Sequence, residues 1–397
     1  MTPFDRSQLH LRQIGDLSYS GWSQLRRCHL RAAFSLSSTT KTLDRGGILS
    51  AIGNARHKLV ELVSKGRRDG LEAPQSGWVR EQFDQLLTNE RAALVAQWSP
   101  ADVPPIRTWP DVALTRALVA RRLGSPEGAQ WPHLVYGQQE GHEAPAPALR
   151  HTEENPVPPK AGEAAIEVTL RDVARGLWGR IDRLENRGGV LVVVDFKSGV
   201  GMPSAQLADR HRLQMLFYAG LVNAAYGTWP RLELVPINGV PVSIGYEPAD
   251  AGVVRAEALV EREALNTELA TGEVVTAVRA TTERCAWCPF QVVCPALRAQ
   301  WAAIESVDGN PPPHHAVSLV AGVVEEVRHH HASTEVVIAQ AEELTAPAGD
   351  VIVTRLPSGL TVSAGSVLAV SRVSPSASVR VLRASWDSIL WPIALTV

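Results

Sequence analysis

The segment GRIDRLENRGGVLVVVDFKSG, at residues 179–199, constrains the fold more than any other part of the chain. Its β-branched runs predict two short strands joined by a turn around Asn186–Gly189. If the strands form a hairpin, Asp182 on the first lies next to Asp195 on the second. Because alternate side chains of a strand point to the same face, Asp195 and Lys197 project to one side of the sheet.

This arrangement predicts a metal site. Two neighbouring carboxylates repel each other unless a cation lies between them, and hard oxygen ligands suit Mg²⁺ or Mn²⁺. Such an ion would polarise a phosphoryl group and lower the pKa of a bound water. Lys197 would orient that water or stabilise the charge that develops on the phosphate. The alternative is a surface Asp and Lys that flank a strand end, which is the usual case for an isolated Asp-x-Lys.

The periodicity of the remaining sequence predicts an α/β fold. Apolar residues at helical spacing indicate helices over 17–36 and 46–66, and more helix to about 124. A third strand, AAIEVTL, precedes the hairpin, and a long helix over 203–227 follows it. The remaining predicted elements are two strands within 232–248, a helix through 250–270 and a helix around 295–305.

A chain of 397 residues is too long for one ordinary core, so we expect two domains. The segment GNPPPHH, at 309–315, is typical of a linker between residues 1–308 and 316–397. Within the first domain, residues about 70–160 indicate a helical insertion that ends in a loop rich in proline. The second domain contains five predicted short strands, which favour a small all-β barrel of the OB type.

Charge is distributed unevenly along a chain whose net charge is only −2. Residues 1–70 contain twelve Lys or Arg against five Asp or Glu, an excess that would attract phosphate. A solvated helical surface is the alternative. Residues 311–397 contain five Lys or Arg against seven Asp or Glu, so the barrel is poorly equipped for nucleic acid and is expected to guide DNA or a protein partner.

The sequence gives no indication of a membrane. Its first residues contain no apolar run of signal-peptide length, and the longest aliphatic run, VLVVV, is far too short to span a bilayer. We therefore expect a cytoplasmic protein.

The chain contains four cysteines, and three of them, Cys285, Cys288 and Cys294, lie within ten positions, whereas Cys28 is far upstream. In a reducing compartment such a cluster favours a metal site over a disulfide framework. Thiolates suit iron–sulfur or zinc, and the four residues alone do not separate the two.

Together, these motifs resemble the PD-(D/E)xK nuclease superfamily in its RecB-like branch. The resemblance implies a restriction-endonuclease-like core, with a mixed central sheet flanked by helices. In that branch a Gly-x-x-x-His on a preceding helix completes the metal site, which here makes His57 a candidate ligand after Gly53. A Gln-x-x-x-Tyr on the following helix corresponds to Gln214 and Tyr218, and Glu167 matches an acidic position often found on the first strand.

The same branch accounts for the cysteines. AddB-type helicase-nucleases and the CRISPR-adaptation exonucleases, which these motifs resemble, have one cysteine before the nuclease core and three after it, spaced C-x2-C-x5-C. In those relatives the thiolates bind a 4Fe–4S cluster, which implies that Cys28, Cys285, Cys288 and Cys294 hold a cluster that joins the two ends of the domain. Zinc remains the competitor. This chain departs from the relatives in having His29, where they commonly have proline, after the leading cysteine.

These observations favour a Mg²⁺- or Mn²⁺-dependent deoxyribonuclease, in particular an exonuclease on linear or single-stranded DNA that serves repair, recombination or defence. Asp182, Asp195, His57 and the backbone carbonyl of Phe196 would hold the metal. Lys197, Gln214 and Tyr218 would serve the attacking water and the strand. The alternatives are a catalytically silent DNA-binding or scaffold subunit and a zinc-stabilised adaptor. Since the sequence has no phosphate-binding G-x-x-x-x-G-K-[ST] loop, unwinding would require a helicase partner.

Overall fold

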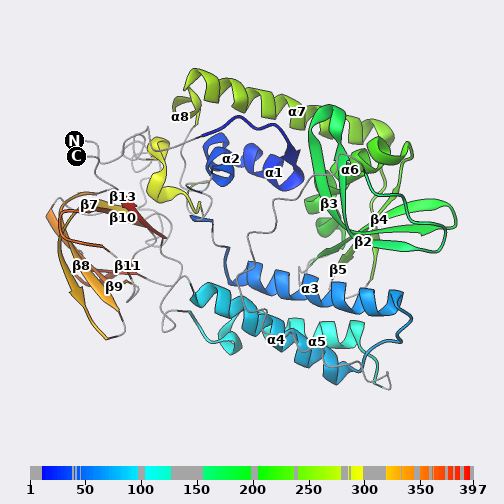
Figure 1. Cartoon of the computed structure of the whole chain (residues 1–397), viewed down its shortest axis with the longest axis horizontal. Helices are drawn as coiled ribbons and strands as arrows, with labels where there is room; N and C mark the ends of the chain where they lie inside the picture. Colours follow the sequence, from blue (N-terminus) through cyan, green and yellow to red (C-terminus); the bar gives the residue numbers. More distant parts are fainter. Residues whose placement is uncertain are drawn as a thin grey trace.

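The computed structural model describes residues 11–37, 40, 43–44, 46–96, 103–126, 155–197, 204–236, 240–278, 285, 288–297, 319–331, 333–343, 349–356, 360, 362–371, 374–378, 381–384 and 389–393. Its described part contains a mixed α/β unit and a C-terminal all-β sheet (Figure 1). The predicted linker at 309–315 and most of the helix expected around 295–305 lie outside the described residues.

The central sheet is mixed, as predicted. It contains β1 (Leu17–Ser18), β2 (Ala164–Asp172), β3 (Leu177–Arg187), β4 (Val190–Lys197), β5 (Arg231–Pro236) and β6 (Val242–Ser243). The path through it runs β1-β3-β4-β5-β6, with β2 also paired to β3. The β1–β3 and β4–β5 pairs are parallel, whereas β2–β3, β3–β4 and β5–β6 are antiparallel.

The hairpin of β3 and β4 is confirmed. Arg187 pairs with Val190, so Gly188 and Gly189 form a two-residue turn with φ of 63° and 90°. Positive φ at both positions is the geometry that glycine accepts at little cost and that matches strand twist. The aliphatic run of β4 is buried on both faces, because Val193 packs in the main core while Val192 packs against β5.

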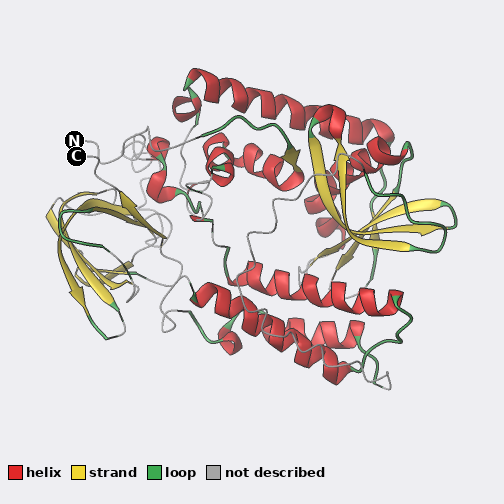
Figure 2. Ribbon diagram, viewed as in Figure 1, coloured by secondary structure: helices red, strands yellow, loops and turns green. Residues whose placement is uncertain are grey.

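Helices flank the sheet on both faces (Figures 1 and 2). One face packs against α1 (Tyr19–Arg27), α2 (His29–Leu36), α6 (Ser204–Tyr226) and α7 (Pro248–Thr271), with the short α8 (Val274–Ala277) after α7. The other face lies toward α3 (Ile48–Arg68), α4 (Ser76–Val95) and α5 (Val112–Leu123). Short 3-10 turns lie at η3 (Ile106–Thr108), η4 (Val173–Arg175) and η5 (Gln291–Val293).

Two helix predictions were wrong in detail. The helix expected over 17–36 is two helices, because Cys28 adopts an extended backbone that ends α1 and begins α2. The Ser18 hydroxyl caps α1, because it accepts a hydrogen bond from the Gly21 N–H at 3.1 Å. The second helix does not stop at Gly66 but continues to Arg68, since other contacts outweigh the weak helix propensity of one glycine.

The C-terminal all-β sheet has seven strands in its described part, not the five expected. They are β7 (Leu319–His329), β8 (Thr334–Glu343), β9 (Gly349–Leu356), β10 (Val367–Ser371), β11 (Ser374–Ser378), β12 (Val381–Arg383) and β13 (Ile389–Ile393), in the order β11-β12-β9-β8-β7-β10-β13. Among the described strands of this sheet, only β9 and β12 pair in parallel. The two missed strands have weak signals, because β11 is serine-rich and β13 contains Pro392, which an edge strand tolerates.

This sheet packs against the rest of the protein. Val367 and Ala369 of β10 belong to the core that contains α1, α6 and η5. In the described part of the chain, no helix has the length and apolar character needed to span a bilayer.

Candidate active site

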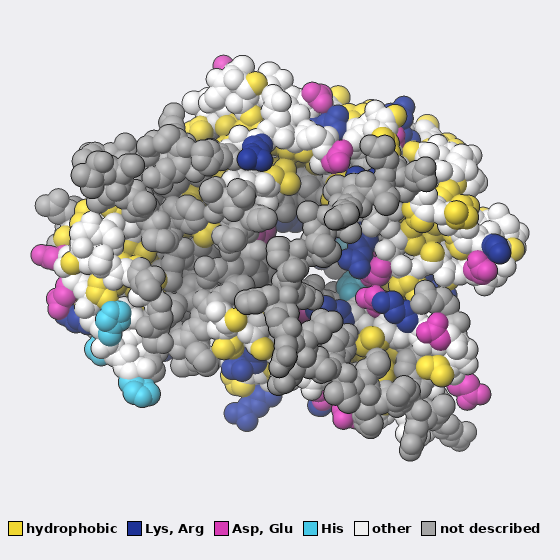
Figure 3. All heavy atoms as spheres, viewed as in Figure 1, with side chains coloured by type: hydrophobic (Ala, Val, Ile, Leu, Met, Phe, Trp, Pro, Cys, Tyr) yellow, Lys and Arg dark blue, Asp and Glu magenta, His cyan; other side chains and the backbone are white. Residues whose placement is uncertain are grey.

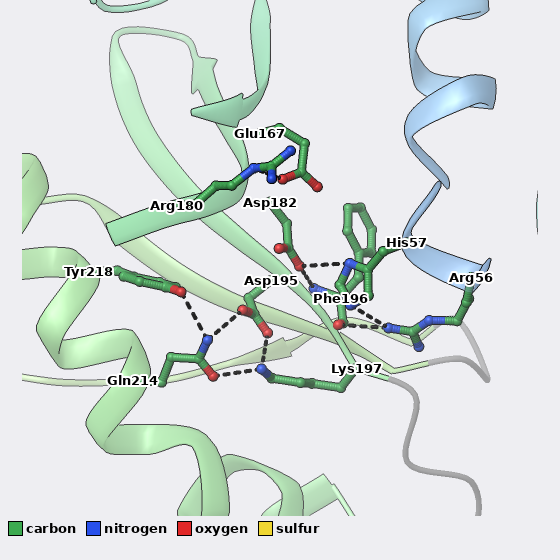
Figure 4. A network of polar contacts seen from close by, with 10 residues as sticks. All are labelled: Arg56, His57, Glu167, Arg180, Asp182, Asp195, Phe196, Lys197, Gln214 and Tyr218. Carbon is green, nitrogen blue, oxygen red and sulfur yellow. Dashed lines mark hydrogen bonds and ion pairs between the residues drawn. The ribbon is translucent and has the colours of Figure 1, made fainter. Parts of the chain in front are cut away.

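The active-site candidates lie where β3 and β4 separate. Their last backbone pair is Arg183 with Val194, so Asp182 and Asp195 face each other at the next position. The Phe196 N–H instead donates to the Asp182 carboxylate at 2.8 Å. The Asp182 side chain thus takes the place of a backbone acceptor, and both carboxylates lie where β3 and β4 separate (Figure 4).

Asp195 is the buried centre of a polar network that reaches α6. Its Oδ2 lies 2.6 Å from Lys197 Nζ, and its Oδ1 accepts from Gln214 Nε2 at 3.2 Å. The Gln214 Oε1 atom also accepts from Lys197 Nζ at 2.6 Å, and Gln214 Nε2 lies 3.1 Å from the Tyr218 hydroxyl oxygen. The Gln-x-x-x-Tyr pair therefore supports the Asp-x-Lys strand directly (Figure 4).

A glycine lets α6 approach the sheet this closely. A Cβ atom added at Gly179 would lie 2.8 Å from Leu221 Cδ1 and 2.9 Å from Tyr218 Cε1. Both contacts are shorter than side chains accept without movement. The glycine of the GRID segment is thus a packing requirement for the Gln214 and Tyr218 network.

The helix α3 brings His57 and Arg56 to the other side of the carboxylates. His57 Nδ1 lies 3.7 Å from Asp182 Oδ2. Arg56 donates through NH2 to the Phe196 carbonyl oxygen at 2.7 Å, and the same nitrogen lies 3.5 Å from His57 Nε2. Arg56 is 3% exposed, so a buried cation contacts the carbonyl that the sequence analysis assigned to the metal.

Glu167 completes the acidic group. The pairs of β2 with β3 on either side, Ile166 with Arg183 and Val168 with Ile181, place Glu167 opposite Asp182. Its φ of 55° is unusual for a residue other than glycine, and its carboxylate forms an ion pair with Arg180. Among the described residues, His57, Glu167 and Asp182 offer donor atoms that all lie within 4.8 Å of one another.

Burial determines the protonation of this group. It raises the pKa of Asp182 to about 6, although the Phe196 N–H opposes the rise. Burial also raises the pKa of Asp195 to about 6 against the attraction of Lys197. It lowers the pKa of His57 to about 4, helped by the charge of Arg56, so the imidazole is neutral at pH 7 and can act as a ligand. Burial raises the pKa of Tyr218 as well, so its phenol is protonated.

The site opens to the surface between α3 and the sheet. In the space-filling view a hollow lies in this region, and the visible side chains around it include basic, acidic and histidine groups (Figure 3). A small cavity beside it is lined by His57, Glu167 and Asp182 among others. A cation or a phosphate would therefore meet this group from one side.

Comparison with known families identifies this arrangement. The model of the PD-(D/E)XK nuclease superfamily matches residues 16–295, which include the hairpin, His57 and both ends of the cysteine set. The chain belongs to the PD-(D/E)XK nuclease superfamily.

Other comparisons add little to this assignment. A solved structure described as "Crystal structure of SSO0001" is 21% identical, and the match covers 34% of this chain and 60% of that chain, with a TM-score of 0.21. The matched part is thus less than two thirds of that protein. No curated protein matches the chain.

Within the PD-(D/E)XK core, the structure gathers every predicted residue of the catalytic group but divides it into two sets. His57, Glu167 and Asp182 form one, whereas Asp195, Lys197, Gln214 and Tyr218 form the hydrogen-bonded other. Two further residues were not predicted from the sequence: Arg56, which contacts the Phe196 carbonyl, and Arg180, which contacts Glu167. The position of Arg56 next to His57 was the one available signal.

The four cysteines of this nuclease-family chain converge although they are far apart in sequence. None of them is in a disulfide. Cys28, Cys288 and Cys294 pack against the same core, and burial, with Cys28 and Cys285 as smaller causes, raises the pKa of Cys288 to about 11. The Leu297 N–H donates to Cys294 Sγ at 3.4 Å. The structure thus brings the thiols into one neighbourhood.

Proposed function

We propose that this protein is a metal-dependent deoxyribonuclease that hydrolyses phosphodiester bonds. The observation that carries the proposal is the pair of half-buried Asp182 and buried Asp195, with Lys197 beside it, at the point where β3 and β4 separate. Superfamily membership supports a phosphodiester hydrolase. Strand preference, exonuclease action and a role in repair, recombination or defence belong to the proposal.

The donor set fits a divalent cation. His57, Glu167 and Asp182 offer one imidazole nitrogen and two carboxylates within 4.8 Å of one another, a set that suits Mn²⁺ or Mg²⁺. A bound ion would neutralise charge on a phosphoryl group and acidify water. Asp195 is 2% exposed and faces Asp182, so it would complete the set. For the Phe196 carbonyl to join, Arg56 would first have to move.

The residues around Asp195 have a separate task. Gln214 accepts from Lys197 and donates to Asp195, so it fixes the direction of the Lys197 ammonium. A fixed ammonium next to a reacting phosphate stabilises negative charge as it develops and needs no reorganisation at that moment. Tyr218, protonated and buried, limits the rotamers of Gln214. We assign Lys197 to catalysis and Gln214 and Tyr218 to positioning.

A surface next to this network supports a nucleic-acid substrate. A cavity of about 250 Å³ on α1 is lined by Tyr19, Trp22, Ser23, Arg26 and Arg27. The ring of Tyr19 lies edge-on to that of Tyr218, with 6.4 Å between centroids. Aromatic and guanidinium groups side by side suit stacked bases and a phosphate backbone. A DNA strand bound on α1 would thus lead toward the Asp182 and Asp195 carboxylates.

We further propose that the four cysteines hold a 4Fe–4S cluster. The C-x2-C-x5-C spacing of Cys285, Cys288 and Cys294 supports a cluster over zinc, because the iron–sulfur relatives that these motifs resemble share it. Thiols kept from disulfides suit a reducing compartment such as the cytoplasm.

The boundaries 1–308 and 316–397 and the OB identity of the second unit are also proposals. The strand order supports an OB barrel. β11 follows β10 after two residues in the sequence, but β11 lies at one end of the strand order and β10 lies near the other end. If they act as one strand, the path closes on itself. Such a barrel would guide DNA or contact a helicase partner.

The test is cleavage of end-labelled linear single- and double-stranded DNA by anaerobically purified protein with Mn²⁺ or Mg²⁺. Asp195→Asn and Lys197→Met serve as inactive variants, and Lys58→Met, whose ammonium pairs with Glu90 on the surface, serves as the control. Cleavage by the wild type and the control alone would support the proposal. Absence of metal-dependent cleavage by the intact protein would favour a silent DNA-binding subunit.

A further inference from the structure

A second cavity lies behind the catalytic strand. It has a volume of about 100 Å³ and is enclosed by α3, α5 and strands β3 to β5. Asp195 and Lys197 point to the α6 side of β4, whereas the Phe196 ring points to this cavity. The cavity is therefore separated from the Lys197 network by the thickness of the sheet.

The lining of this cavity is strongly basic. Arg56, Arg67, Arg122 and Arg183 contribute to it, and none of the lining residues among the described part of the chain is acidic. Burial lowers the pKa of Arg122, and the charge of Arg67 lowers it further. Because neighbouring guanidinium charges destabilise one another, a bound anion would stabilise the group.

The hydrogen bonds of these arginines provide little negative charge to balance them. Arg122 donates to the Pro236 carbonyl oxygen at 2.5 Å, and Arg67 donates to the Leu123 carbonyl oxygen at 3.4 Å. These acceptors are neutral. Within the described residues, Arg183 alone among the four has a carboxylate at contact distance, since its NH2 lies 2.6 Å from Glu185 Oε1.

Two buried donors in the cavity wall also have no acceptor. In the described part of the chain, the Nε atoms of Arg56 and Arg183 are buried without a hydrogen-bond partner. An unsatisfied buried donor is unfavourable and calls for an explanation such as a bound anion that accepts from it. Arg56 is 3% exposed, so its side chain lies in the protein interior and not on a solvated surface.

We propose that this cavity is a binding site for a phosphoryl group, as inorganic phosphate or as the terminal phosphate of a mononucleotide. One guanidinium group can bind two phosphate oxygens at once through two parallel N–H donors. The volume exceeds the space for one water molecule and is well below the ~300 Å³ at which drug-sized pockets begin.

The site does not depend on the proposed nuclease activity, and its test measures binding alone. The full-length protein, freed of divalent metal by chelation and dialysis, is titrated calorimetrically with sodium phosphate and, separately, with thymidine 5′-monophosphate at constant ionic strength. The variants are Arg122→Gln and Arg67→Gln. Arg67 lines the cavity from an exposed position, so its replacement is the safer one for folding.

Arg121→Gln is the matched control, because Arg121 is an exposed arginine in the same last turn of α5 and does not line the cavity. We expect saturable one-to-one binding to the wild type and to Arg121→Gln, with affinity at least about tenfold weaker in both cavity variants. Binding of the mononucleotide but not of inorganic phosphate would identify a nucleotide as the ligand. Absence of saturable binding of either, or an equal loss in Arg121→Gln, would overturn the proposal.

Discussion

Glu167 lies opposite Asp182 across β2 and β3, and its backbone adopts a φ of 55° there. A left-handed residue within a strand is strained, and such strain persists where the surroundings hold the residue for a purpose. It brings the Glu167 carboxylate to the same donor group as His57 and Asp182. This relationship makes Glu167 a metal ligand in our proposal.

Glu167→Gln should weaken Mn²⁺ binding at least about tenfold, because the substitution removes a charged ligand and keeps the side-chain shape. Calorimetric titration of the folded protein with Mn²⁺ measures this without reference to cleavage. Glu163→Gln, on the segment that precedes β2, is the control with an exposed carboxylate. Equal Mn²⁺ affinity in the two variants would remove Glu167 from the metal site.

Lys197→Met should lower kcat about 10²- to 10³-fold, the usual loss when one preorganised charge on the transition state is removed. KM should change little, since the ammonium is held by Asp195 and Gln214 inside the site. The substitution also leaves the Asp195 carboxylate buried without its cation, which raises its pKa further. Rates must therefore be compared at several pH values, and far-UV circular dichroism must show a folded variant.

Gly179→Ala should destabilise the protein by about 1–3 kcal/mol, because the added methyl group would meet Leu221 and Tyr218 at less than 3 Å. The loss should be visible as a lower thermal midpoint. Gly77→Ala in α4 is the opposite control, since nothing lies within 4 Å of the added Cβ and alanine favours a helix. If Gly179→Ala has the same thermal midpoint as the wild type, the packing of α6 does not depend on this glycine.

The fold could be predicted where one local signal dominated. The β-branched run of β4 and the turn at Gly188 and Gly189 define the hairpin, and the hairpin register brings Asp182 to Asp195. What the sequence did not reveal depends on contacts between distant elements. The hydrogen bond from Arg56 to the Phe196 carbonyl joins residues 140 positions apart, and no local pattern predicts it.

The same distinction applies to the ends of elements. The break at Cys28 interrupts an otherwise helical pattern, because the backbone there turns extended between α1 and α2. Helical periodicity continues through this position, so the pattern alone predicted one helix. The strand β13 was missed for a related reason, since Pro392 argues against a strand unless its place at a sheet edge is known.

Cys294→Ser should remove the metal centre and lower stability markedly. In the proposed centre, Cys28 and the trailing cysteines close a loop of more than 250 residues, and closing a loop of that size is worth on the order of several kcal/mol in chain entropy. Iron and acid-labile sulfide analysis of anaerobically purified protein should give about four of each per chain. Zinc without iron would replace the cluster proposal by a zinc site.

Arg26→Ala and Arg27→Ala should each weaken the binding of single-stranded DNA and reduce its salt dependence. Both side chains line the cavity on α1 with Tyr19, and each phosphate contact that is lost should lower the slope of log affinity against log salt by about 0.7. The measurement is fluorescence anisotropy of a labelled oligonucleotide at several salt concentrations without divalent metal. Arg116→Ala, in α5 and paired with Asp84, removes the same charge from a surface outside this cavity. Salt slopes that match those of this control would exclude α1 from the path of the strand.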